Sequence, residues 1–241
     1  MLMNIDDVWE RLSNNNFKVS TDTREDVTGT VFFALKGENF YCNVFVKDVL
    51  YKGAIFVVSE NSLDVLQKIA RRYRDQFDIP IIAIGGSNGK TTTRELTRHV
   101  LETKYKIHST ESNLNNHIGV PLSILSMDKI SELGLFEIGA NHIGEHTALL
   151  DILNPTHVVV TNNGLDHLEG FGSPEDVVKA NEEINVWAHL HKAIVLENTD
   201  HGLGVSTSLP ITLNKDGVEY QTSLVGDYNL ENIERAISVG E

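Results

Sequence analysis

The sequence predicts an α/β fold, with a small N-terminal α/β domain followed by a central domain that has a mostly parallel sheet and flanking helices. From Pro80 onward, short apolar runs alternate with segments of helical periodicity, which is typical of a parallel sheet covered by helices. A glycine-rich turn directly follows one of these runs, residues 81–84. The polar residues 75–78 precede this region and indicate a domain boundary. We therefore predict two domains, residues 1–78 and 79–241.

The N-terminal domain is predicted to combine three short strands with three helices. Apolar, aromatic and β-branched runs predict strands at residues 17–20, 31–35 and 54–58. Apolar residues at helical spacing predict helices around Val8 and Leu12, at 44–52, and from Leu63 to about Arg74.

The central domain is predicted to alternate strands and helices along the chain. Strands are expected at 81–84, 105–109, 133–138, 156–161 and 193–196, and helices at 94–102, 118–125, 142–153 and 174–190. Ligands of such sheets bind beyond the carboxyl ends of the strands. Glu137 and Asn162 stand at two of these ends, so we expect both residues to share one crevice with the glycine-rich turn.

Composition excludes several classes of protein. The 241 residues are 41% hydrophobic but contain no apolar run of the roughly 20 residues that span a bilayer. The net charge of −14 argues against nucleic acid or an anionic membrane as a partner. The single cysteine, Cys42, excludes an internal disulfide, and the acidic N-terminus lacks the pattern of a signal peptide. We expect a cytoplasmic monomer that neither inserts into membranes nor binds nucleic acid.

The glycine-rich turn, Gly86-Ser87-Asn88-Gly89-Lys90-Thr91-Thr92, predicts a phosphate-binding loop. Gly86 and Gly89 allow consecutive N–H groups to face one anion, and the helix that follows points its positive end at the same place. Lys90 can reach the β- and γ-phosphates of a nucleotide, and Thr91 can bind Mg²⁺. The spacing between the glycines is two residues shorter than in the common Walker A pattern. An ordinary strand-to-helix turn is the alternative, but it does not explain why Lys90 and Thr91 follow the second glycine.

Polar residues at other strand ends are candidates for the same chemistry. Glu137 ends an otherwise apolar strand, so it is either a Mg²⁺ ligand or one half of a surface ion pair. His167, in the polar loop 162–172, could bind a second metal ion or orient a phosphate, although a loop histidine is more often structural or exposed. Asn115 and Asn116 either offer amide donors beside a helix start or serve as turn residues.

Four segments in order along the chain resemble the Mur ligases, the ATP-dependent amide ligases of peptidoglycan synthesis. These segments are residues 86–92, 113–121, 137–145 and 166–173. The last two resemble the branch of the family that joins D-Ala-D-Ala to a UDP-MurNAc-tripeptide. Residues 21–24 and 32–40 resemble the family's UDP-sugar-binding domain, residues 197–200 its adenine-side motif, and residues 226–232 the helix start that closes its central domain.

The resemblance implies an activity, with ATP and Mg²⁺ as cofactors, and a set of residue roles. The γ-phosphate of ATP moves to the carboxylate of a UDP-MurNAc-peptide, and the amine of D-Ala-D-Ala then attacks the acyl phosphate. The implied catalytic residues are Lys90, Glu137 and His167, and the implied metal ligands are Thr91, Glu137 and His167. The implied nucleotide-binding residues are Gly86, Ser87, Asn88, Gly89, Lys90, Thr91, Thr92, Asn198 and Asn229, and the implied substrate-binding residues are Thr23, Arg24, Asn115 and Asn116.

The chain departs from the family pattern in ways that bear on activity. Asn181 stands where the family carries a lysine modified to a carbamate, so an amide replaces one anionic metal ligand. Glu241 is the last residue, where the family's third domain would begin, and only about 25 residues separate Asp200 from Gly226. Residues 41–43 also differ from the usual acidic, glycine and histidine or asparagine trio. We therefore expect a shortened central domain, no C-terminal domain, and little amide formation by this chain alone.

Two alternatives to such a ligase stay open. The first is a non-catalytic relative that binds a nucleotide or a UDP-sugar, which Asn181 and the missing third domain favour. The second is another ATP-dependent carboxylate–amine ligase, such as a folylpolyglutamate synthase relative, because such enzymes share the loop and the metal ligands. The N-terminal domain and the run Asn141-His142-Ile143-Gly144-Glu145 argue against the second alternative.

Overall fold

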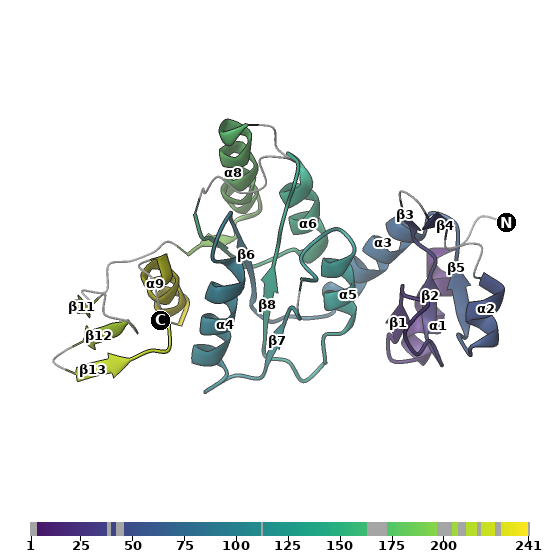
Figure 1. Cartoon of the computed structure of the whole chain (residues 1–241). Coiled ribbons are helices and arrows are strands. Elements are labelled where there is room, and N and C mark those ends of the chain that lie inside the picture. Colours follow the sequence, from purple (N-terminus) through teal and green to yellow (C-terminus); the bar gives the residue numbers. More distant parts are fainter. Residues whose placement is uncertain are drawn as a thin grey trace. The chain divides into compact units, whose positions relative to one another are not determined.

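The computed structural model describes residues 4–37, 40–41, 46–111, 113–162, 173–196, 204–206, 211–215, 218–224 and 228–240. The chain forms two compact units, which are described separately here (Figure 1). The first unit comprises Met1–Asp78, Glu111–Lys129 and Asp151–Asn154, and the second comprises Ile79–Thr110, Ile130–Leu150 and Pro155–Glu241. Both units combine parallel strands with helices, which confirms the predicted α/β class.

The first unit is built on a three-stranded parallel sheet in the order β1–β2–β5. Its strands are β1 (Val19–Ser20), β2 (Val31–Phe33), β3 (Lys36–Gly37), β4 (Phe40–Tyr41) and β5 (Phe56–Val58), of which β3 and β4 form a separate antiparallel pair. Its helices are α1 (Ile5–Asn14), α2 (Val46–Tyr51), α3 (Ser62–Arg74) and α5 (Gly119–Leu125).

Apolar residues at the spacing noted in the sequence hold this unit together. Val8 and Leu12, one helical turn apart on α1, are fully buried. Phe32, on the central strand β2, is fully buried in a cluster with residues from the elements around it. Asn4 caps α1, because its Oδ1 accepts a hydrogen bond from Asp6 N at 3.0 Å. The burial of one face of each element therefore explains why short segments are stable here.

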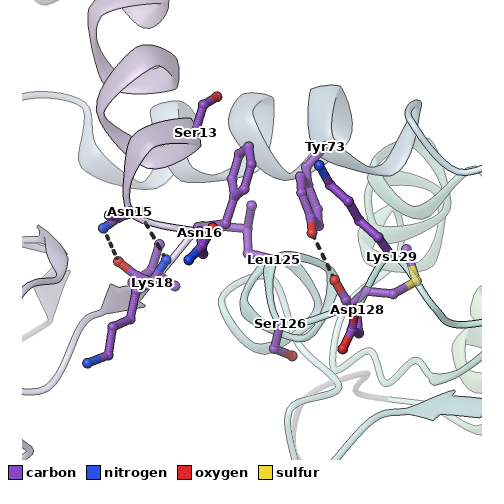
Figure 2. Close-up of a pocket in the computed structure, with 12 residues that line it drawn as sticks. Ser13, Asn15, Asn16, Lys18, Tyr73, Leu125, Ser126, Asp128 and Lys129 are labelled. Atoms are coloured by element: carbon purple, nitrogen blue, oxygen red, sulfur yellow. Dashed lines mark hydrogen bonds between the residues drawn. The ribbon is translucent and has the colours of Figure 1, made fainter.

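A hollow of about 670 Å³ lies in the first unit, between the turn after α1 and the loop after α5 (Figure 2). Two of the polar side chains that line it bond within the protein. The amide nitrogen of Asn15 donates to Lys18 O at 2.9 Å, and the hydroxyl of Tyr73 donates to Met127 O at 2.8 Å (Figure 2). The second bond ties the end of α5 to α3, so these groups have a structural role.

The second unit contains the larger sheet. Its strands are β6 (Ile81–Gly85), β7 (Ile107–Ser109), β8 (Leu133–Glu137), β9 (His157–Val160), β10 (Ile194–Val195), β11 (Gly204–Ser206), β12 (Thr212–Lys215) and β13 (Val218–Gln221). Its helices are α4 (Lys90–Leu101), α6 (Glu145–Leu153, whose last turn belongs to the first unit), α8 (Pro174–His191) and α9 (Tyr228–Gly240).

The five-stranded sheet is parallel throughout, in the order β10–β9–β6–β8–β7. The central strand β6 pairs with β8 on one side, where Ile84 aligns with Glu137, and with β9 on the other, where Gly85 aligns with Val160. The chain thus continues to opposite sides of β6, which makes its carboxyl end a topological switch point. Ligands of open parallel sheets bind at such points.

Two apolar clusters position the elements around β6. Ile82 and Ile84 of β6 pack in one cluster with apolar residues of β8, β9 and α4. Leu96 of α4 packs against the other, which contains Ile233 of α9, and α4 and α9 lie side by side in Figure 1. The helix that follows the glycine-rich turn is therefore held between the sheet and α9.

The structure differs from the sequence predictions at several element boundaries. The helix after the glycine-rich turn begins at Lys90 rather than Arg94. Helix α6 begins at Glu145 rather than His142, because the Glu145 carboxylate accepts hydrogen bonds from Asn141 N at 2.7 Å and from His142 N at 3.2 Å. The pair β3–β4 and the antiparallel sheet β11–β12–β13 were not predicted. Within the described part of the chain, every helix is too short or too polar to cross a membrane.

Candidate nucleotide-binding site

The loop between β6 and α4 needs glycine at two positions. Gly86 has φ +113°, and a Cβ there would lie 2.8 Å from Thr161 N and clash with Thr161 Oγ1. Gly89 has φ +80°, and a Cβ there would clash with the side-chain oxygen of Asn232. Positive φ is costly for residues with a side chain. The loop therefore packs closely against the end of β9 and against α9, as a close approach of backbone requires.

Lys90 stands at the first position of α4, directly above this loop. Its Nζ donates to Gly86 O at 2.9 Å and to Ser87 O at 2.6 Å. The first N–H groups of α4 and the positive end of its dipole lie at the same place. An ammonium group, a loop of backbone amides and a helix N-terminus together form the arrangement that binds phosphate groups.

Glu137 faces the first turn of α4. Its Oε2 accepts a hydrogen bond from Thr91 Oγ1 at 2.9 Å and lies 3.4 Å from Arg94 Nη1. Glu137 and Arg94 are 2% and 3% exposed, so each charge is compensated by the other in a buried position. The alternative that Glu137 makes a surface ion pair is wrong. The Thr91 hydroxyl and the Glu137 carboxylate thus place two oxygen atoms close together, one of them anionic, and Mg²⁺ prefers oxygen ligands of this kind.

Asn162, which follows β9, makes hydrogen bonds to the phosphate loop with both its backbone and its side chain. Asn88 N donates to Asn162 Oδ1 at 3.0 Å, and Asn162 Nδ2 donates back to Asn88 O at 3.2 Å. Ser87 N donates to Asn162 O at 2.9 Å. The structure thus brings the ends of both strands, at Glu137 and Asn162, to the phosphate loop.

Helix α9 supports the same loop with two buried asparagines. Asn232 Oδ1 accepts a hydrogen bond from Thr93 Oγ1 at 3.3 Å, and Asn232 Nδ2 donates to Asn229 Oδ1 at 3.1 Å. Asn229 and Asn232 are both buried. Asn229 was predicted to bind the nucleotide. In the structure it bonds to Asn232, and Asn232 in turn lies against Gly89.

His146, near the start of α6, is buried between α6 and α8. Burial lowers the pKa of His146, and Lys90 lowers it further, whereas the bond to Ala180 O and the carboxylate of Glu183 raise it. The net lowering leaves the imidazole neutral at pH 7. Its Nδ1 lies 2.8 Å from Ala180 O and therefore carries the proton that it donates there. His146 thus fixes the middle of α8 without adding a charge.

The predicted substrate-binding residues lie in the first unit. Arg24 forms a forked ion pair with Asp22, and hydrogen bonds from Arg24 lower the pKa of Asp22 to about 2. Thr23 O accepts a hydrogen bond from Lys52 Nζ at 2.9 Å. Asn116 Oδ1 accepts from Gly119 N at 2.9 Å, at the start of α5, which favours its alternative role as a turn residue.

Two predicted site residues fall outside the described part of the chain, and two residues at the site were not predicted. His167 and Asn198 were predicted as metal and nucleotide ligands, and they lie outside the described residues. Arg94 and Asn232 were missed, although Arg94 lies three residues after Thr91 and so on the same helix face. Among the described residues, no group of three or more histidine, cysteine, aspartate or glutamate side chains could hold a metal ion.

Comparison with known proteins gives one consistent result. Residues 84–205 match the model of the Mur ligase middle domain. A UDP-N-acetylmuramoyl-tripeptide–D-alanyl-D-alanine ligase of Bacillus subtilis is 36% identical over 182 residues, which cover 69% of this chain and 40% of that protein. The protein of the same name from Synechocystis is 31% identical over 278 aligned positions, covering 100% of this chain and 61% of that protein.

Solved structures agree with the sequence relatives. The crystal structure of MurF from Acinetobacter baumannii superposes with a TM-score of 0.77 at 25% identity, covering 92% of this chain and 58% of that one. The chain therefore spans less than two thirds of the length of each of these relatives.

Proposed function

Because this chain belongs to the Mur ligase family, we propose that it binds Mg-ATP and acts as an ATP-dependent amide ligase of peptidoglycan precursor synthesis. The reaction joins D-Ala-D-Ala to a UDP-MurNAc-tripeptide through an acyl phosphate. The single observation that carries the proposal is the geometry of the phosphate loop. Lys90 Nζ donates hydrogen bonds to two loop carbonyls, and Thr91 Oγ1 donates one to Glu137. Similarity to UDP-N-acetylmuramoyl-tripeptide–D-alanyl-D-alanine ligases supports the choice of substrates.

Each residue of the loop has a defined task in this reaction. Ser87 N and Asn88 N donate to Asn162, so the N–H groups at the start of α4 bind the phosphates. Lys90 transfers its hydrogen bonds from loop carbonyls to the β- and γ-phosphates. Thr91 and Glu137 provide oxygen ligands for Mg²⁺, which supplies charge neutralisation of the phosphates when bound. Arg94 Nη1 lies 3.4 Å from Glu137 Oε2 and places a positive charge beside the buried carboxylate.

Phosphoryl transfer asks for positioning more than for covalent catalysis. The γ-phosphoryl group passes to a carboxylate oxygen of the peptide while the bond to ADP breaks. The amine of D-Ala-D-Ala then attacks the acyl carbon, phosphate leaves, and the amine gives up a proton. His167 and Asn198 complete the site in this proposal, and Thr23, Arg24, Asn115 and Asn116 bind the UDP-MurNAc-peptide.

We also propose the roles of the two domains, the cellular location and the oligomeric state. Residues 1–78 act as the UDP-MurNAc-binding domain and residues 79–241 as the ATP-binding domain. The protein is a cytoplasmic monomer, which its single cysteine and its net charge of −14 favour. Size-exclusion chromatography with light scattering tests the monomer, for which 26.8 kDa is the expected mass.

Lys90→Ala tests the nucleotide site. We expect the wild-type chain to bind Mg-ADP in calorimetry and the variant to lose at least about 100-fold in affinity, because a charged donor to the phosphates is removed. Lys104→Ala, an exposed lysine after α4, is the matched control and should leave affinity unchanged. Equal affinity of wild type and Lys90→Ala would contradict the assignment of the loop.

A second function, nucleotide binding without ligation, is favoured by one observation. Asn181 is a buried amide at the position where the family carries its modified lysine. Release of ADP from ATP in the presence of UDP-MurNAc-tripeptide and D-Ala-D-Ala separates the two functions. Turnover that depends on both substrates identifies a ligase, whereas tight Mg-ADP binding without turnover identifies a binding protein.

A further inference from the structure

Helix α8 contacts the phosphate loop through the side chain of Asn181. Asn181 is 4% exposed, and its Nδ2 donates to Ser87 Oγ at 3.2 Å and to Asn162 O at 3.4 Å. Asn162 O also accepts the bond from Ser87 N. The amide of Asn181 therefore joins the two segments that form the wall of the loop, one after β6 and one after β9.

The start of α6 holds Asn181 in place from both sides along α8. The residue before it, Ala180, accepts the hydrogen bond from His146 Nδ1 at 2.8 Å. Two residues after it, the Glu183 carboxylate accepts from Thr147 N and from Thr147 Oγ1, both at 3.1 Å. Glu183 also accepts from Gly144 N. Asn181 thus projects from a segment whose position is fixed, which makes its hydrogen bonds pre-organised.

The chemistry of this side chain suits a loop support and does not suit a cation ligand with negative charge. A carboxamide is neutral at every pH, and its nitrogen donates hydrogen bonds but does not react with carbon dioxide. In the structure that nitrogen faces loop oxygens. Among the described residues no cluster of three or more acidic, histidine or cysteine side chains forms a metal site. A second cation held from α8 by a carbamate therefore does not fit these residues.

We propose that Asn181 is a positioning residue that holds the phosphate loop in its nucleotide-binding shape, and that nucleotide binding here does not depend on bicarbonate. This inference rests on the proposed nucleotide site. Ser87 and Asn162 keep their mutual geometry because the Asn181 amide bridges them. Loss of the bridge removes one donor from Ser87 Oγ and one from Asn162 O and lets the loop open, which weakens binding of the phosphates.

The test compares two asparagines of the same helix. Asn181→Ala removes the bridge, whereas Asn185→Ala makes the same change at an exposed position one turn further along α8. We expect Asn181→Ala to weaken Mg-ADP binding about tenfold in calorimetry and Asn185→Ala to leave it unchanged. Wild-type affinity should be the same with and without added bicarbonate. Binding by Asn181→Ala within twofold of wild type, or a bicarbonate-dependent wild type, overturns the inference.

Hydrogen exchange separates positioning from general stability. In the free proteins, Asn181→Ala should speed exchange of the Ser87 and Asn88 amides, while the amides of β6 keep wild-type protection. Ser87→Ala removes the same bond from the loop side and provides a second route if Asn181→Ala folds poorly. Where both variants fold, they form a double-mutant cycle. The two changes should be non-additive, because both remove one bond, and additive effects contradict the bridge. A wild-type chain that binds no Mg-ADP would instead overturn the proposed function.

Discussion

The two predicted binding regions hold their charged groups in opposite ways. In the second unit, Glu137 is 2% exposed and is contacted by Thr91 and Arg94 from a helix that is distant in sequence. In the first unit, the side chain of Arg24 is 87% exposed and pairs with Asp22, two residues earlier. One region is assembled by the tertiary structure, whereas the other is a local surface pair.

This difference decides how far each motif can be interpreted. A buried group that makes several hydrogen bonds or ion pairs has its geometry set before a ligand arrives, so its contacts are evidence for a chemical role. An exposed pair opens at little energetic cost, so Arg24 can exchange Asp22 for another anion. The contacts of the phosphate loop therefore support a functional proposal, whereas the Thr21–Arg24 segment supports a prediction from resemblance alone.

The largest effect is expected from Gly86→Ala, which tests how tightly the loop is packed. The added Cβ meets Thr161 N, a backbone atom, at a residue with φ +113°. We expect a loss of about 2 kcal/mol or more in unfolding free energy, together with loss of Mg-ADP binding. Urea unfolding and calorimetry measure the two effects.

Gly144→Ala is the matched control for that substitution. Gly144 has φ +91°, but a Cβ there meets nothing within 4 Å. It therefore reports the backbone cost alone, without a clash. If both variants lose the same stability, the close packing of the phosphate loop against β9 contributes nothing, and the contrast between the two regions weakens.

A smaller effect is expected from Glu137→Gln, which tests the role of the buried carboxylate. The variant keeps the shape but removes the anionic oxygen beside Thr91. We expect the gain in ADP affinity on adding Mg²⁺ to fall at least about tenfold, because a charged oxygen ligand is lost. Calorimetry with Mg²⁺ and with EDTA measures this gain for each protein.

Glu95→Gln serves as the control for Arg94. Glu95 also pairs with Arg94, at 2.7 Å, but its side chain is 43% exposed. The control should keep the full Mg²⁺ dependence. Should both variants lose it equally, the effect would come from an unbalanced Arg94, and Glu137 would not be a metal ligand.

The smallest effect is expected from Arg24→Ala, which tests the surface pair. Arg24 lowers the pKa of Asp22 from 3.8 to about 2. The pair therefore stabilises the folded state above pH 3.8, and this stabilisation is lost as the pH falls from 3.8 to about 2. In the variant the pKa of Asp22 should rise toward 3.8, as NMR titration would detect. Thermal unfolding at pH 7 should barely change, and a large drop would show that the pair is structural.

Much of the site was accessible from sequence because its members are close in the chain or end strands. Residues 86–92 are consecutive, so the spacing of glycine, lysine and threonine indicates their joint role. Glu137 was found because a charge at the end of an apolar strand needs a partner. Asn181 was noticed only as a departure from a family pattern, and its bonds to Ser87 and Asn162 required the packing of α8 to be known.

The missed elements share a physical reason. Strands β12 and β13 are rich in Thr, Asn, Lys, Glu and Gln, so neither apolar content nor β-branching marks them clearly. The order of the large sheet was also inaccessible, because strand pairing between β6 and its neighbours joins residues 50 or more positions apart. The partner Asn232 lies further still from Gly89.

The contact of α4 with α9 imposes an order on biosynthesis. Strand β6 emerges from the ribosome early, yet its two neighbours follow only with residues 133–137 and 157–160. Leu96 packs with apolar residues that extend to Ile237. A nascent chain therefore keeps an apolar face of α4 uncovered until α9 has been translated, and Gly89 of the glycine-rich loop gains its contact with Asn232 only then.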